Sequence, residues 1–199
     1  MRYPAATWRP GPPEKTCYPG VRIRTGKGAV LHSMEGPLSA ALGELDKLDR
    51  RASWHFSNPK SGPLLQHYET EAPTWHAGYQ ANCAYIGVEH EGVAGQPLTE
   101  VQVANDVALL RWLAQQEDWP SFSRHATLWE HNEFMQTSCP SGRIPWARII
   151  ADLENDMSEQ EKIELSLRKA AAGLTKLLAD LDFQKVANAM KVYLGVVAQ

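Results

Sequence analysis

An abrupt change in composition near residue 150 constrains this chain more than any other feature of its sequence. All seven His, all seven Trp and all thirteen Pro lie before that point. The last fifty residues contain only two Gly, Gly173 and Gly195, and they are rich in the helix-forming residues Ala, Leu, Lys and Glu. The sequence therefore predicts a compact domain over residues 1–152 and a helical appendage over residues 157–199.

Charge and hydropathy exclude several classes of protein. The chain has 199 residues and a net charge of −3, which argues against nucleic-acid binding through a general basic surface. No apolar run approaches the roughly 20 residues that span a bilayer, so we expect no stable membrane insertion. The N-terminal segment lacks the apolar core of a signal peptide, which predicts a cytoplasmic location in the producing cell. Three cysteines cannot all pair within one chain, and a reduced state is the better expectation.

Within residues 1–152, strand patterns alternate with helix patterns. The first 28 residues contain five prolines and predict an irregular arm. Alternation of strands and helices predicts an α/β fold with a mixed central sheet flanked by helices, because some neighbouring strands are linked as hairpins. The expected strands are residues 28–33, 53–57, 63–69, 84–91 and 125–131, and the expected helices are residues 38–52, 99–117 and 144–154.

The C-terminal segment has its own helix signals. Residues 158–161 fit the S-x-x-E capping box, and apolar residues follow at helical spacing. A second apolar pattern begins near Phe183, so the segment is predicted to form a helical hairpin. We expect its apolar faces to be buried against the first domain or in a homo-oligomer formed through these helices; an element that binds the cell wall or perturbs an outer membrane is the alternative. From residue 150 onward there are six Lys/Arg against eight Asp/Glu, which disfavours a cationic membrane-active helix.

The histidines are concentrated between residues 32 and 131, and three of them lie at or near the ends of predicted strands. His131 and Cys139 lie on one predicted loop, and His32 closes a separate strand. Imidazole and thiolate are the ligands that zinc prefers, and a catalytic zinc keeps three of them plus a water. Spacing alone leaves two interpretations open: a metal site, or histidines held by ordinary polar contacts.

Five strings of sequence carry a resemblance to a known family. They are VLHSMEG (30–36), SWHF (53–56), QHYETEAPTWHAG (66–78), YIGVEHEG (85–92) and WEHNEFMQTSCPSG (129–142). In this order and at these intervals they resemble the type 2 N-acetylmuramoyl-L-alanine amidases. This zinc family includes phage endolysins and is related to the peptidoglycan recognition proteins. The resemblance covers residues 27–150 and implies the mixed α/β fold of that family.

The resemblance also implies roles for individual residues. Zn²⁺ would be bound by His32, His131 and Cys139, with a fourth position left for water. Glu89 stands where family members with an IG-x-E strand carry the general base. Thr137, two residues before the third ligand, stands where the family has Lys or Thr, and its hydroxyl is expected to help bind the oxyanion.

One position departs from the family pattern. Phage-type relatives often have a catalytic tyrosine where this chain has Trp54, and indole donates a hydrogen bond but accepts none. The role is then absent, or it falls to His55, His76 or Glu89. Side chains alternate along a strand, so only one of Trp54 and His55 readily faces the metal. Trp54, His55, Trp75 and His76 are the expected substrate-binding residues, and stacking on sugar or peptide is the expected role of the two tryptophans.

The resemblance implies a zinc-dependent peptidoglycan hydrolase that cleaves the amide bond between N-acetylmuramic acid and L-alanine. A phage or prophage endolysin that acts on the cell wall after release is the favoured interpretation. Two alternatives stay open: a recognition module that binds peptidoglycan without cutting it, and a cytoplasmic amidase of wall recycling. Non-catalytic relatives commonly lose the cysteine ligand, and this chain retains Cys139, which favours the enzyme.

Overall fold

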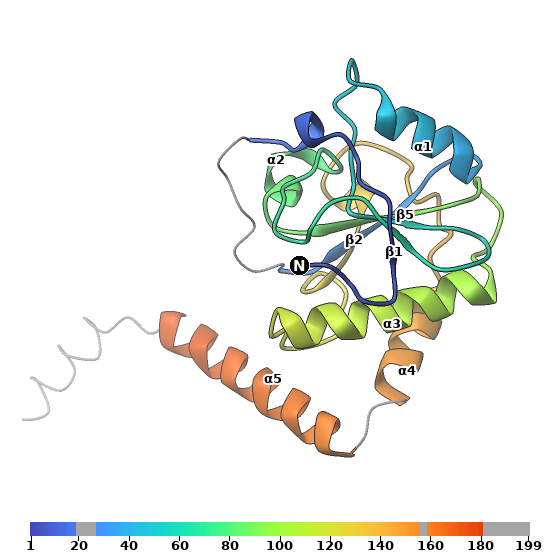
Figure 1. Cartoon of the computed structure of the whole chain (residues 1–199). Coiled ribbons are helices and arrows are strands. Elements are labelled where there is room, and N and C mark those ends of the chain that lie inside the picture. The colour runs from blue at the N-terminus through green and yellow to red at the C-terminus, as the bar shows by residue number, and fades with distance from the viewer. Residues whose placement is uncertain (19–26, 156–158, 181–199) are drawn as a thin grey trace, which may run out of the picture.

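The computed structural model describes residues 1–18, 27–155 and 159–180. A six-stranded sheet forms the centre, in the order β1-β4-β3-β5-β2-β6 (Figure 1). Of the neighbouring strands, only β3 and β4 are antiparallel, which confirms the predicted mixed sheet. The strands are β1 (Thr7–Trp8), β2 (Ala29–Ser33), β3 (Phe56–Asn58), β4 (Leu65–Gln66), β5 (Ile86–His90) and β6 (Leu128–Glu130).

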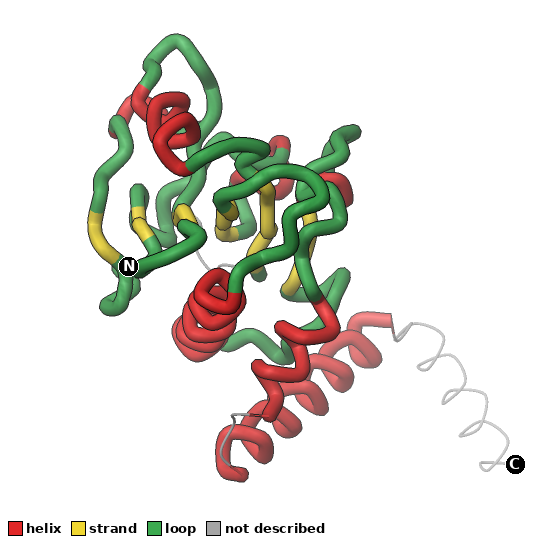
Figure 2. The backbone as a smooth tube through the Cα atoms, turned by 90° about the vertical axis from the view of Figure 1, so that its right-hand side faces the viewer, coloured by secondary structure: helices red, strands yellow, loops and turns green. Residues whose placement is uncertain are grey.

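The helices surround this sheet (Figures 1 and 2). Helix α3 begins after Thr99, whose hydroxyl accepts a hydrogen bond from the Gln102 N–H while the Gln102 side chain bonds back to the Thr99 N–H. This capping box satisfies backbone donors that would otherwise lack partners. The helices are α1 (Leu38–Asp46), α2 (Gly78–Asn82), α3 (Glu100–Gln116), α4 (Trp146–Asn155) and α5 (Glu159–Asp180), with short 3₁₀ helices η1 (Pro13–Lys15) and η2 (His131–Glu133).

The two faces of the central strands meet different partners. Leu31 of β2 and Val88 of β5 belong to the main hydrophobic core, together with Leu109, Leu110 and other buried residues of α3. Val30, one residue earlier on β2, packs with α2 in a separate cluster. Because side chains alternate along a strand, the face opposite α3 also receives the residues between these core positions. That face is where the chemistry-bearing side chains of both strands lie.

Several local predictions differ from the structure, and the strands predicted over residues 53–57, 63–69 and 125–131 are shorter, at Phe56–Asn58, Leu65–Gln66 and Leu128–Glu130. The helix predicted over residues 38–52 ends at Asp46, and Leu48 is 65% exposed. Leu48 lies beyond the last turn, so it has no helical neighbour that would bury it. The N-terminal arm, predicted as irregular, contributes the edge strand β1, and the five-residue helix α2 lacked any periodicity that would predict it.

Helix α5 runs beneath α3 and extends away from the sheet (Figure 1). Arg168 joins it to α3, since its Nη1 lies 3.4 Å from the Ala114 carbonyl oxygen. Several large apolar side chains of α5 remain exposed: Ile163, Leu167, Leu174, Leu177 and Leu178. The second helix of the predicted hairpin lies outside the described residues, so the hairpin and the domain limits stay predictions. Among the described residues, no helix has both the length and the hydropathy needed to span a bilayer.

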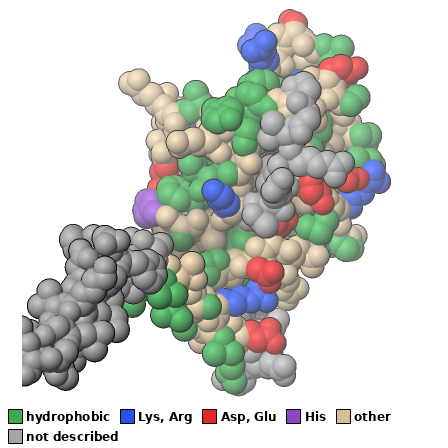
Figure 3. Space-filling model, turned by 90° about the vertical axis from the view of Figure 1, so that its left-hand side faces the viewer, with side chains coloured by type: hydrophobic (Ala, Val, Ile, Leu, Met, Phe, Trp, Pro, Cys, Tyr) green, Lys and Arg blue, Asp and Glu red, His purple; other side chains and the backbone are tan. Residues whose placement is uncertain are grey.

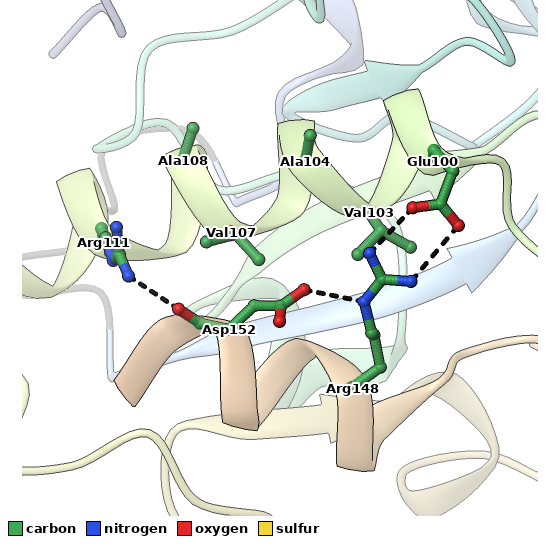
Figure 4. A pocket seen from close by; sticks show the side chains of 8 residues that line it. All are labelled: Glu100, Val103, Ala104, Val107, Ala108, Arg111, Arg148 and Asp152. Carbon is green, nitrogen blue, oxygen red and sulfur yellow. Dashed lines mark hydrogen bonds and ion pairs between the residues drawn. The ribbon is translucent and has the colours of Figure 1, made fainter. Parts of the chain in front are cut away.

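Charged side chains of both signs are interspersed with hydrophobic ones on the face that Figure 3 shows. A cavity of about 440 Å³ lies elsewhere, between α3 and α4 (Figure 4). Arg148 lines it and forms ion pairs with Glu100 at 2.8 Å and with Asp152 at 2.9 Å. These charges are paired with one another and no histidine or cysteine lines the cavity, so it lacks the residue types expected of a metal site.

Candidate metal centre and active site

The three predicted metal ligands lie together. His32 is the fourth residue of β2, His131 opens η2 directly after β6, and Cys139 lies on the loop that follows. Strands β2 and β6 are parallel neighbours, so their carboxyl ends meet at one edge of the sheet. One ligand atom from each of the three residues lies within 4.8 Å of the others. These residues, His32, His131 and Cys139, are called the metal group below.

Hydrogen bonding determines which nitrogen of His32 faces the metal group. Nδ1 of His32 lies 4.0 Å from Cys139 Sγ, while Nε2 lies 3.2 Å from Nδ1 of His76. A metal-binding histidine usually donates its second ring N–H to a neighbour, which fixes its tautomer. Nδ1 of His32 is therefore the free ligand nitrogen, and His76 accepts from Nε2. Burial lowers the pKa of His32 well below its usual value, so the ring stays neutral as ligation requires.

Glu89 stands beside this group. It is the register partner of His32 on the adjacent strand β5, and its Oε1 lies 3.8 Å from His32 Nδ1. Burial raises the pKa of Glu89 to about 7. Its Oε2 is buried and has no hydrogen-bond partner among the described residues, and the same holds for Nε2 of His76. Buried polar atoms without partners are rare, and they mark places where a ligand, ion or water is bound.

The surroundings of Cys139 suit a thiol that binds a metal cation. Its Sγ accepts a hydrogen bond from the Ser33 N–H at 3.2 Å, and its carbonyl accepts from the Asn132 N–H at 3.0 Å. Burial and the nearby Glu89 raise the pKa of the thiol to about 12. A thiol in this setting becomes a thiolate at neutral pH only beside a metal ion or another cation. The donor set therefore suits Zn²⁺, for which imidazole nitrogen and thiolate sulfur are common ligands.

Thr137 lies on the same loop as Cys139. Its exposed side chain accepts a hydrogen bond from the Cys139 N–H at 3.2 Å through Oγ1. A hydroxyl can donate while it accepts, so Thr137 keeps a donor for a group bound beside the metal group. Its role in binding an oxyanion stays a prediction.

The structure does not bring all the predicted substrate-binding residues together. Trp54 is only 6% exposed and packs with Leu45 and Tyr68, and its Nε1 donates to Ser57 Oγ at 2.9 Å. The indole is thus part of a hydrophobic cluster.

His55 is a buried residue that forms hydrogen bonds to the backbone near the site. It is fully buried; its Nδ1 accepts from the Gly87 N–H at 3.0 Å, and its Nε2 lies 2.8 Å from the Ala72 carbonyl oxygen. Its ring centroid lies 6.1 Å from that of His76. Both nitrogens are occupied, so His55 holds β5 and the His76 segment together, and burial lowers its pKa to about 4.

Trp75 and His76 are neighbours in sequence but have different surroundings. His76 contacts His32 directly, as described above. Trp75 is half-buried, with the Tyr18 ring centroid at 4.9 Å and the Arg51 guanidinium 5.5 Å above its own ring. Tyr79 packs on Tyr18 and is 69% exposed. This aromatic surface is open to solvent and is available for stacking on a sugar or peptide.

Arg143 is a buried residue near the site that no sequence pattern singled out. Its side chain is 5% exposed and bonds to the ends of both β2 and β5. A single arginine in a loop sequence carries no periodicity or spacing signal, and only the folded structure shows its partners.

The fold and the site define an α/β protein whose central strands carry a group of ligands for a metal ion beside a buried carboxylate. A family model of the N-acetylmuramoyl-L-alanine amidases (Amidase_2) matches residues 23–142, more than half of the chain. The chain belongs to the N-acetylmuramoyl-L-alanine amidase family, and it is a peptidoglycan amidase.

Solved structures share this fold. N-acetylmuramoyl-L-alanine amidase LysC from Clostridium intestinale URNW is 20% identical with a TM-score of 0.53, over 77% of this chain and 94% of LysC. AmpD, as a selenomethionine derivative, is 20% identical with a TM-score of 0.60, over 76% of this chain and 96% of AmpD. PlyL is 16% identical with a TM-score of 0.61, over 77% of this chain and 99% of PlyL. No curated protein sequence matches the chain.

Proposed function

We propose that this amidase hydrolyses the bond between N-acetylmuramic acid and L-alanine with a zinc ion held by His32, His131 and Cys139. The observation that carries the proposal is the grouping of these three ligand atoms within 4.8 Å, beside a buried carboxylate. When bound, zinc supplies a Lewis acid that polarises the amide carbonyl and makes water nucleophilic near neutral pH.

Glu89 is the general base of this proposal. Its pKa of about 7 places it where a group can accept a proton and return it at physiological pH. Glu89 takes a proton from the attacking water and delivers it to the nitrogen of L-alanine as the amide bond breaks. Thr137 donates its hydroxyl hydrogen to the oxygen on which negative charge develops.

The substrate lies against the surface formed by Trp75 and His76. The exposed aromatic rings beside Trp75 offer stacking surface for a sugar or an extended peptide. His76 contacts the ligand His32 through Nδ1, and His55 acts through it by packing against its ring. Trp54, buried among hydrophobic side chains, supports the wall of the site and does not touch substrate.

We propose the endolysin role over wall recycling. The names of two similar solved structures, LysCS from Clostridium intestinale URNW and a mutant endolysin from Bacillus subtilis, describe endolysins. An endolysin cleaves intact cell wall, whereas a recycling amidase acts on small soluble fragments. Comparing rates on purified wall sacculi and on soluble muropeptides discriminates the two roles, and a strong preference for soluble muropeptides would overturn the endolysin role.

Helix α5 is proposed to join two copies of the chain. Its exposed leucines recur on one helical face, and such a face is more stable when covered. Deleting residues 157–199 should convert a dimer to a monomer in sedimentation experiments and leave activity per folded molecule unchanged. A full-length chain that sediments as a monomer at micromolar concentration would overturn this part of the proposal.

The decisive test of the activity is digestion of purified peptidoglycan with and without a chelator. We expect newly freed L-alanine amino groups with zinc present and none after chelation, with recovery on adding zinc back. Release of reducing sugars in place of amino groups would show a glycosidase, and amino groups that appear undiminished after complete zinc removal would contradict the metal mechanism.

A further inference from the structure

The guanidinium of Arg143 joins the loop of Cys139 to the ends of the two central strands. Its Nη1 donates to Ser33 Oγ at 2.7 Å and to the His90 carbonyl oxygen at 3.2 Å. Its Nη2 donates to the Glu91 carbonyl oxygen at 2.8 Å, and its Nε to the Gln96 carbonyl oxygen at 2.8 Å. Ser33 ends β2 and His90 ends β5, so one side chain ties both strand ends to one loop.

Ser33 links Arg143 to the metal group. Its hydroxyl accepts from Arg143, while its backbone N–H donates to Cys139 Sγ at 3.2 Å. Arg143 and Cys139 therefore both form a hydrogen bond with Ser33, which directly follows the ligand His32. The bonds of Arg143 thus fix the separation between the third ligand and the first.

The space around the guanidinium is closely fitted. Gly92 has a φ of +129°, and a Cβ at that position would lie 2.2 Å from Arg143 Nη2. A glycine is required there both for its backbone conformation and for this close approach. The planar fork of arginine suits four acceptors in different directions, and a lysine ammonium with three donors reproduces them incompletely.

We propose that Arg143 is a positioning residue of the metal centre, which holds Cys139 in place to bind zinc through the shared contact with Ser33. This inference rests on the proposed metal site and adds a residue outside the ligand set. Partners beyond the ligands typically change metal affinity by about 10- to 100-fold when they are mutated. We expect effects of that size from Arg143.

The test compares zinc binding by the full chain with Arg143→Lys and Ser33→Ala. Zinc affinity is measured by competition with a chelating dye, and cobalt is substituted to record the thiolate-to-metal absorption band. We expect about 10-fold or greater loss of affinity and a weakened cobalt–thiolate band in Arg143→Lys. Ser33→Ala keeps the backbone N–H to Cys139 and should lose affinity by a smaller factor. Arg148→Lys, in the ion pairs between α3 and α4, is the matched control and should bind zinc like the parent chain.

The outcomes separate the inference from the proposed function. Wild-type zinc affinity and cobalt spectrum in folded Arg143→Lys and Ser33→Ala would overturn the role of Arg143 and leave the metal site intact. Failure of the parent chain itself to bind zinc would overturn the metal site. If Arg143→Lys does not fold, as judged by thermal unfolding in the presence of chelator, Ser33→Ala decides alone: an unchanged affinity refutes the inference.

Discussion

A partly buried carboxylate and a fully buried imidazole lie on opposite faces of β5, one residue apart, and they differ in how completely their hydrogen bonds are satisfied. Glu89 faces the metal group, with one carboxylate oxygen lacking a partner. His90 faces α3, where Nε2 lies 2.9 Å from both carboxylate oxygens of Asp106 and Nδ1 lies 2.7 Å from the His32 carbonyl oxygen. Asn58 completes this second group by donating to Asp106 at 2.8 Å.

One of these groups contributes to the stability of the fold, and the other is suited to binding and catalysis. The His90–Asp106–Asn58 group is closed, and nothing further can bind there without breaking a bond. The metal group, with Glu89 and His76, is open, and its unpartnered atoms carry a desolvation cost in the absence of a ligand. The same strand thus contributes to a structural network on one face and to an active site on the other. Each of the following experiments changes one face and asks whether the other responds.

Removing a metal ligand should have the largest effect on activity. In His131→Ala, two ligands remain, and release of L-alanine amino groups from peptidoglycan should fall to the background rate because zinc is no longer held in catalytic geometry. His125→Ala is the control, since that histidine is 66% exposed and lies outside the metal group. A His131→Ala protein with full activity and full zinc content would refute the ligand set.

Glu89→Gln should lower kcat by about 10²- to 10⁴-fold, the range for loss of a general base, while zinc content stays at the parent level. Glutamine has nearly the same shape as glutamate but lacks the carboxylate that accepts the proton. Glu91→Gln is the control: that carboxylate accepts from the backbone N–H groups of Leu38 and Lys60. A small change in kcat for Glu89→Gln, with the pH profile unmoved, would assign the base elsewhere.

Asp106→Ala tests the closed group. Removing one partner of a buried ion pair destabilises a protein by about 3–5 kcal/mol, so the urea midpoint should fall strongly. Activity per folded molecule, measured below the unfolding transition, should stay within about two-fold of the parent, because Glu89 faces the other side of the sheet. A large loss of kcat in fully folded protein would show that the two faces are coupled.

Periodicity predicted both faces in part. A short apolar run predicted β2 and a second strand pattern predicted β5, while the metal group and Glu89 were implied by the family resemblance that the five motifs carry. Arg143 and the pairing of His90 with Asp106 leave no such pattern. Their partners are backbone carbonyls or residues far along the chain, such as Ser33, which lies 110 positions from Arg143. The burial of Trp54 was also beyond the sequence, since an indole suits a core and a binding surface equally.

The smallest predicted effect is on stability as a function of pH, and it has opposite signs for different buried histidines. Burial lowers the pKa of His55 and His67 to about 4, below the unfolded value near 6.5. Their neutral forms stabilise the fold at pH above 6.5, and this contribution is lost as the pH falls toward 4, where the unfolded chain takes up more protons. For His90, burial acts to lower the pKa, but Asp106 and the His32 carbonyl outweigh it and the net pKa is raised.

The contribution of His90 is therefore fully present below pH 6.5 and is lost as the pH rises through its folded pKa. Urea unfolding of the zinc-free chain between pH 4 and 8 should show a fall in midpoint on the acid side. The histidines with a lowered pKa outnumber the histidines and carboxylates with a raised pKa, which are His90 and Glu89; the lowered histidines are His32, His55, His67, His76 and His131. In Asp106→Ala the pKa of His90 is no longer supported by its carboxylate partner, so burial makes it one more lowered histidine. The acid-side fall should then steepen, and an acid side unchanged from the parent chain would show that the ion pair with Asp106 is not what holds the proton on His90.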